Sequence, residues 1–163
     1  MRALLFSALV ACGPSGSFEF SDRTYSAEKL TAQTVTNEGL TGIDVLLAAD
    51  PIRQASDDEI SVRVTLMWPI GSPPATDKDI ALGGAALVAL VRIACYCGGK
   101  DEAFMEPVVS GKVRFSKLSL DATIEIEGHF DAVFKGQLAL ISGGILYEDE
   151  TLTVHVSGFK ATK

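Results

Sequence analysis

Apolar and polar residues alternate along a stretch in the second half of the chain. From Ala122 to Lys135 the polar side chains fall on one side and all the apolar ones except Val133 fall on the other, with Gly128 in the middle. Because successive side chains of a strand point to opposite faces, this stretch predicts a half-buried β-strand. Residues 111–116 alternate in the same way. We therefore expect a β-hairpin over Gly111–Lys135, with a bend or bulge at Gly128.

Charge and apolar matching predict a register for this hairpin. Folding the chain about Ser119-Leu120 places Arg114 opposite Glu125 and Lys112 opposite Glu127, with apolar residues facing each other on the other side. Opposite charges across a pair contribute modestly, and the apolar pairs supply most of the packing. Since leucine is unfavourable at positive φ, we expect a four-residue loop rather than a two-residue turn.

Further runs predict strands in the rest of the chain. The run Ala85–Cys97 fits either a buried helix or a buried central strand, and its β-branched residues and flanking glycine pairs favour the strand. Residues 101–107 predict a loop or a short helical turn, and residues 148–150 predict a turn. The other expected strands are 17–20, 43–48, 60–68, 137–141, 145–147 and 151–159.

Short strands separated by regular turn signals predict an all-β fold, either an antiparallel β-sandwich or a partly open barrel of meander hairpins. The 163 residues are enough for one domain with a core. A hydrophobic content of 47% with 21% charged residues excludes a disordered chain. The net charge of −7 and the lack of a basic patch in the sequence predict no nucleic-acid partner.

The N-terminus indicates where the protein resides. Arg2 precedes a short apolar run that ends in Leu9-Val10-Ala11-Cys12, and a Gly/Ser-rich segment follows. This sequence resembles the lipobox of bacterial lipoproteins, in which a cysteine takes a diacylglyceryl group and becomes the new N-terminus. The resemblance implies a short signal peptide (1–11), lipid attachment at Cys12 and a tether (12–17). The strand pattern predicts a single β-sandwich domain (18–163) after them. The alternatives are an uncleaved apolar N-terminus and an ordinary signal peptide.

The same resemblance implies a location, the cell envelope, and a partner, the membrane itself. Acyl chains on Cys12 would hold the protein at a membrane, so the expected location is the bacterial cell envelope. The residue after the cysteine is Gly13 rather than aspartate, which resembles the signal of lipoproteins that are sorted to the outer membrane. No other segment is long and apolar enough for a transmembrane helix, since Arg92 interrupts the most apolar run.

Cys95 and Cys97 are the remaining cysteines. On a strand they point to the same face, so a disulfide between them would be strained. Two small buried thiols are the simpler interpretation, and a redox pair is the alternative. Cys-Tyr-Cys alone lacks the spacing and the second ligand pair of a metal site.

A second candidate group lies on the polar face of the predicted hairpin strand. His129 has Glu127 and Asp131 two residues away on either side, and three such groups could bind a metal or form an acid–base pair. A solvated strand face is the alternative, and His155 is also expected to point outward.

These patterns predict a non-catalytic binding or structural module without a cofactor, because the sequence contains no recognisable set of nucleophile and base. One alternative is a barrel-like carrier of a small apolar ligand, with the 85–97 strand lining its cavity. The other is a metal or redox protein that uses either of the two candidate groups.

Overall fold

The computed structural model describes residues 14–20, 22–49, 60–84, 87–95, 101–105, 108–119, 124–140 and 145–162. All regular elements in these ranges are β-strands, and none of the ranges contains a helix of the length and apolar character needed to cross a membrane. The strands are β1 (Gly16–Phe20), β2 (Arg23–Ser26), β3 (Lys29–Asn37), β4 (Leu40–Ala49), β5 (Ile60–Pro69), β6 (Asp79–Ala81), β7 (Val88–Cys95), β8 (Asp101–Met105), β9 (Val108–Ser119), β10 (Glu125–Leu140) and β11 (Ile145–Thr162).

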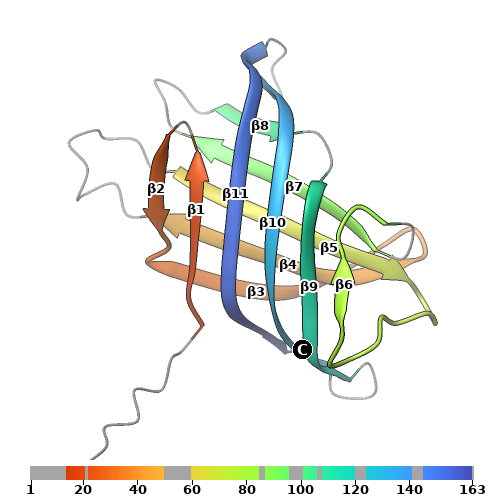
Figure 1. The fold of residues 1–163 in the computed structure, drawn as a ribbon. Helices are drawn as coiled ribbons and strands as arrows, with labels where there is room; N and C mark the ends of the chain where they lie inside the picture. Colours follow the sequence, from red (N-terminus) through yellow and green to blue (C-terminus); the bar gives the residue numbers. More distant parts are fainter. Residues whose placement is uncertain are drawn as a thin grey trace, which may run out of the picture.

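The strands form two antiparallel sheets that pack face to face (Figure 1). The first sheet has the order β2-β1-β11-β10-β9-β6, and the second has the order β3-β4-β5-β7-β8. The strands of one sheet run across those of the other, as in an orthogonal sandwich (Figure 1). A short pairing of β8 with the end of β10 joins the sheets at one corner, while β2, β6 and β3 remain open ends. The predicted all-β sandwich is therefore confirmed, and it is not closed into a barrel.

Alternation of apolar and polar residues explains how each sheet contributes to the core. On β5, Val62, Val64 and Leu66 point inward and are fully buried, while Arg63 and Thr65 between them point outward. Each fully buried side chain of this size contributes roughly 1.5–3 kcal/mol. The inward residues of the two sheets fill the space between them with large side chains, namely Trp68, Phe18, Phe115, Phe130, Phe134, Ile43, Leu47, Leu66, Leu87, Ile93 and Ile126.

The predicted hairpin forms, but its predicted register is wrong. Ser119 pairs with Glu125 and Lys117 with Glu127, so the connecting loop is longer than expected. The apolar face of β10 is buried as predicted. The predicted bulge at Gly128 is also confirmed, because the register of β10 shifts beside this residue toward both neighbouring strands. A Cβ at Gly128 would lie 2.8 Å from a ring atom of Phe159, which explains why the position lacks a side chain.

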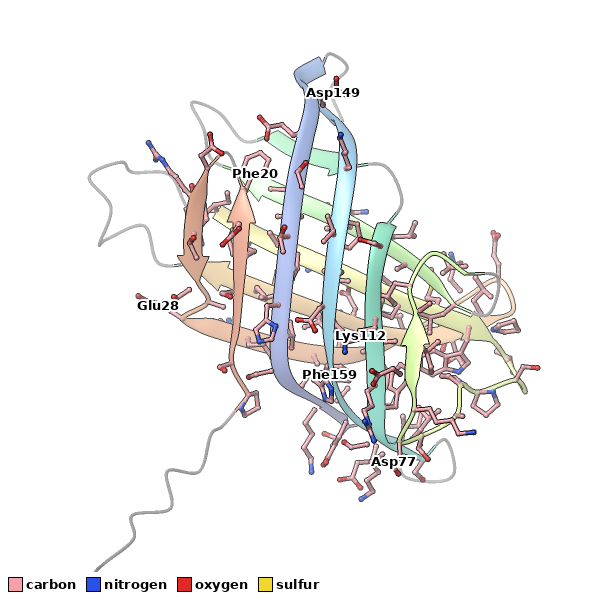
Figure 2. The ribbon with its side chains drawn as sticks, in the orientation of Figure 1. Phe20, Glu28, Asp77, Lys112, Asp149 and Phe159 are labelled. Atoms are coloured by element: carbon pink, nitrogen blue, oxygen red, sulfur yellow. The ribbon has the colours of Figure 1, made fainter. Side chains whose placement is uncertain are left out.

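Two further expectations are wrong. Residues 101–105 form β8 instead of a loop or helical turn, because they extend the second sheet next to β7. Residues 148–150 lie within β11 instead of forming a turn. Two residues there face one residue of β10, and Asp149 (φ 60°) takes up the extra length as a bulge near the upper end of β11 (Figure 2). The turn expected at residues 142–144 lies outside the described residues.

The prediction of a strand at residues 85–97 is confirmed for β7, but this strand is not buried on both faces. Ala89, Val91 and Ile93 are buried against the first sheet. Val88 and Leu90 on the other face have exposed fractions of 43% and 48%. In the described part of the chain no further layer covers the outer face of the second sheet, which accounts for this exposure.

The folded domain begins earlier than Phe18. β1 starts at Gly16, which pairs with Val156 of β11, so the last two residues of the predicted tether belong to the first sheet. Ser15 is fixed as well: its carbonyl oxygen accepts hydrogen bonds from the backbone N–H of Ser157 (2.9 Å) and from the Ser157 hydroxyl (3.0 Å).

Candidate functional site

The cysteines lie mostly outside the described residues. Neither Cys12 nor Cys97 is described. The backbone of Cys95 forms the end of β7, where it pairs with Ile60 on one side and Asp101 on the other. The predictions of lipid attachment at Cys12 and of a redox pair or disulfide at Cys95 and Cys97 therefore remain predictions.

Glu127, His129 and Asp131 lie on the outer face of β10, as expected, but Glu127 and Asp131 pair with different residues of β11. Glu127 Oε1 accepts a hydrogen bond from Lys160 Nζ at 2.7 Å, and Asp131 Oδ1 pairs with His155 Nδ1. His129 lies between them, exposed and opposite Arg114.

This arrangement does not favour a metal site. Residues two apart on one face of a strand are separated by roughly 7 Å, so their side chains must converge to share an ion. Instead they pair with neighbouring strands, and the described residues contain no group of three or more His, Cys, Asp or Glu side chains that could hold a metal ion.

A network of four charges surrounds the start of β10. Glu125 accepts a hydrogen bond from Lys160 Nζ at 2.9 Å and also forms an ion pair with Lys117. Lys160 donates a second hydrogen bond to Glu127, so it bridges the two glutamates. Hydrogen bonds from Lys117 and Lys160 lower the pKa of Glu125 from 4.5 to about 2. Bonds to Glu127 and Glu125 raise the pKa of Lys160. The network joins β9, β10 and β11 on a solvated face, which indicates a structural role.

We expect this network to make folding stability pH-dependent. Because the pKa of Glu125 is lower in the folded state, its contribution is present above pH 4.5 and is lost as the pH falls from 4.5 toward 2. An NMR titration of the Glu125 carboxyl carbon should give a pKa of about 2 in the wild type. Lys117→Gln and Lys160→Gln should each raise this pKa, whereas Lys135→Gln, elsewhere on β10, should not. An ordinary pKa in the wild type would contradict the network.

The pairing of β1 with β11 places three polar residues side by side on neighbouring strands, a row that sequence reasoning missed. Ser17 lies directly opposite His155, which in turn lies opposite Asp131. Serine, histidine and aspartate in this order suit a proton relay. However, no hydrogen bond joins Ser17 to His155 in the described structure, and the histidine and aspartate side chains are 58% and 48% exposed. Acyl transfer needs preorganised donors in a site shielded from water, and an open sheet face does not provide one.

A groove of about 440 Å³ begins one step further along the same face. It is lined mainly by polar side chains of β1, β2 and β11, including Glu19, Thr24, Thr151 and Thr153. The Thr24 hydroxyl donates to Glu19 at 3.4 Å. The described lining residues contribute hydroxyl, carboxylate and guanidinium groups, and Phe20, which is only 6% exposed, is the one apolar residue among them, so the chemistry of the groove is mainly that of a hydrated surface.

The outer face of the second sheet carries a more specific arrangement, centred on Asp44 of β4. The side chain of Asp44 is only 7% exposed, although it points away from the core. Its carboxylate accepts hydrogen bonds from the Thr65 hydroxyl (2.8 Å) and from Gln33 Nε2 (3.2 Å). It also forms an ion pair with Arg63, whose Nε lies 3.5 Å away. Two hydrogen-bond donors and one ion-pair partner from the two neighbouring strands therefore compensate the burial of this charge.

A pocket of about 240 Å³ opens beside this cluster. Strand register places Leu90 opposite Thr65 and Arg92 opposite Arg63, so two guanidinium groups and an exposed leucine border the pocket. We define the Asp44 pocket as Asp44, Arg63, Thr65, Leu90 and Arg92. In contrast to the two groups on the first sheet, it combines a buried anchoring charge, exposed cations and an apolar wall.

The sequence contained a signal for this site. Asp44 interrupts the apolar run 43–48, which was expected to be a buried strand. A carboxylate in such a run requires local hydrogen-bond donors, and these can indicate a site. The donors themselves could not be identified, because Gln33 and Thr65 lie on different strands whose registers the sequence leaves open.

Comparison of the chain with protein-family models, with curated proteins and with solved structures finds no match.

Proposed function

We propose that this chain is a lipoprotein of the bacterial cell envelope, anchored to the membrane through Cys12, with a non-catalytic β-sandwich that serves as a binding or structural module. The observation that carries the proposal is the sequence Leu9-Val10-Ala11-Cys12 directly before a folded domain. Gly13 after the cysteine favours the outer membrane as the location.

The way in which the domain begins supports an anchor at Cys12. Ser15 is hydrogen-bonded to Ser157, so the chain is attached to the sandwich three residues after the cysteine. Three residues span at most about 10 Å. A lipid on Cys12 would therefore hold this end of the first sheet directly at the membrane surface, with little freedom for the domain to move away.

The exposed polar groups support a module without catalysis. Lys117 of β9 and Lys160 of β11 pair with glutamates of β10, and the His155–Asp131 pair is open to solvent. The carrier alternative requires room between the sheets. In the described part, aromatic rings occupy this space, with Trp68 and Phe115 at a centroid distance of 5.4 Å and Phe130 and Phe159 at 6.1 Å. No observation favours the metal or redox alternative over the proposed module.

Membrane fractionation of bacteria that express the full chain tests the proposal. The wild type should be found with the membranes and should require detergent for release. Cys12→Ala removes the thiol that takes the diacylglyceryl group, so detergent should no longer be required. Cys97→Ala is the matched control and should behave as the wild type. Equal release of wild type and Cys12→Ala without detergent would overturn the anchored module.

A further inference from the structure

The chain joins the sandwich beside the last part of β11. The Ser15 carbonyl oxygen accepts a hydrogen bond from the Ser157 N–H. A Cβ at Gly158 would lie 3.9 Å from the Pro14 Cα. Followed back from β1, the chain therefore runs toward the C-terminal end of β11, and Figure 1 shows the start of β1 and the C-terminus at the same end of the first sheet. Cys12 precedes Pro14 by two residues, so it lies within about 7 Å of Pro14.

This end of the first sheet carries the four-charge network, which consists of Lys117, Glu125, Glu127 and Lys160. Its positive and negative charges cancel, so the network as a whole neither attracts nor repels a charged surface. The lysine side chains are 50% and 51% exposed, whereas the glutamate side chains are 22% and 34% exposed. An ammonium group has three donors, of which Lys160 uses two within the network and Lys117 uses one. Both lysines can therefore also donate to the phosphate oxygens of lipid headgroups.

The opposite end of the first sheet is acidic. β11 begins there and includes the run Glu148-Asp149-Glu150, whose middle residue is labelled in Figure 2. β8 lies next to this end, because it pairs with the last residues of β10, and it contains Asp101 and Glu102. These acidic residues outnumber Lys135 of β10 and Arg92 of β7, the cations that strand pairing brings alongside in the described part of the chain. An anionic lipid surface repels carboxylates that come within about 10 Å of it, so this end is unfavourable for contact with a membrane.

We propose that the domain stands end-on at the membrane, with the four-charge network facing phospholipid headgroups and the acidic end pointing away. The inference rests on the proposed lipid at Cys12, which brings one end of the sheet to the surface, and it adds which side chains meet the headgroups. Glu125 pairs with Thr162 at the membrane end. Lys135 lies ten positions further along β10, roughly 30 Å away, so the two ends are far enough apart to be distinguished by a local probe.

Fluorescence quenching on vesicles tests this orientation. The full chain is purified with its lipid, and Cys95→Ala and Cys97→Ala ensure that an added cysteine carries the only label. Thr162→Cys, Lys135→Cys and Val88→Cys place this label at the anchored end, at the acidic end and on the exposed face of the second sheet. The vesicles contain phosphatidylethanolamine, phosphatidylglycerol and a lipid with a nitroxide quencher on its headgroup. The label at position 162 should lose most of its fluorescence, and the labels at positions 135 and 88 should lose little.

A charge reversal tests the contact between the network and the headgroups. Lys117→Glu leaves one positive and three negative charges in the network, so it should reduce the quenching at position 162 on these anionic vesicles. On vesicles of phosphatidylcholine, which have no net charge, the same substitution should leave the quenching unchanged. Lys135→Glu is the matched control, because it makes the same change at the far end, and it should not alter the quenching at position 162 on either kind of vesicle. Equal quenching with and without Lys117→Glu on the anionic vesicles would contradict the contact.

Two further results would overturn the inference alone: a lipid-carrying chain whose label at position 135 is quenched as strongly as that at position 162, or one whose label at position 88 is quenched most. The second result would show that the outer face of the second sheet lies on the membrane. A chain that carries no lipid and does not bind the vesicles would instead overturn the proposed function together with this inference. The mass of the purified chain distinguishes these cases.

Discussion

Replacement of Gly42 by alanine should destabilise the protein by about 3 kcal/mol or more. Gly42 of β4 pairs with Met67 of β5, and a Cβ at this position would lie 1.9 Å from the carbonyl oxygen of Leu66 and 2.8 Å from the Met67 Cα. These are backbone atoms of a neighbouring central strand. They can move only if the ladder between β4 and β5 is distorted, so the methyl group cannot be accommodated by a change of rotamer.

Urea unfolding followed by fluorescence measures this effect, because the single tryptophan, Trp68, is fully buried. Gly158→Ala in β11 is the matched control. The nearest atom to a Cβ at Gly158 is 3.9 Å away, and the φ of this residue is outside the left-handed region. The control should stay within about 0.5 kcal/mol of the wild type. A similarly small change for Gly42→Ala would show that the close contact between β4 and β5 is absent.

Phe115→Ala should cost about 4 kcal/mol, because it removes a ring from the centre of the interface between the sheets. Phe115 is fully buried on β9. Its ring makes edge contacts with Trp68 of the second sheet and with Phe159 of β11, at ring-centroid distances of 5.4 and 6.2 Å. Figure 2 shows Phe159 toward the lower end of β11. The truncation therefore removes buried apolar area and two ring contacts, and it leaves a cavity.

Circular dichroism should follow the unfolding of this variant, because the removed ring contacts Trp68 and would alter its fluorescence directly. Ile70→Ala removes an apolar side chain that is 59% exposed and should change stability by about 0.5 kcal/mol or less. If Phe115→Ala lost less than about 1 kcal/mol, Phe115 would not be packed between the two sheets as described.

Alternation along the chain was sufficient to predict the fold class. In β10 and β5 the apolar residues recur at every second position, and the structure buries those residues. The same rule explains why the hairpin register was predicted wrongly. The observed register differs from the predicted one by five residues at Glu125–Glu127 and by four from Gly128 to Val133, beyond the bulge. A shift of four residues keeps every side chain on its original face, so the apolar pattern there cannot distinguish the two registers. The length of the loop decides between them.

The candidate site was harder to predict for a related reason. The Asp44 pocket combines residues of three strands, and the Ser17–His155–Asp131 row combines the first strand with the last two. Neither combination follows from local sequence. β7 was expected to be buried on both faces because almost all its residues are apolar, and periodicity does not show whether a second layer covers a strand. The exposure of Leu90 is therefore visible only in the folded chain.

The most direct test of the account is the intact mass of the full-length chain after purification from bacterial membranes. The account predicts a mass that lacks residues 1–11 and carries a diacylglyceryl group on Cys12. An unmodified mass that includes residues 1–11 would contradict the anchored module and would leave Cys12 as a free thiol.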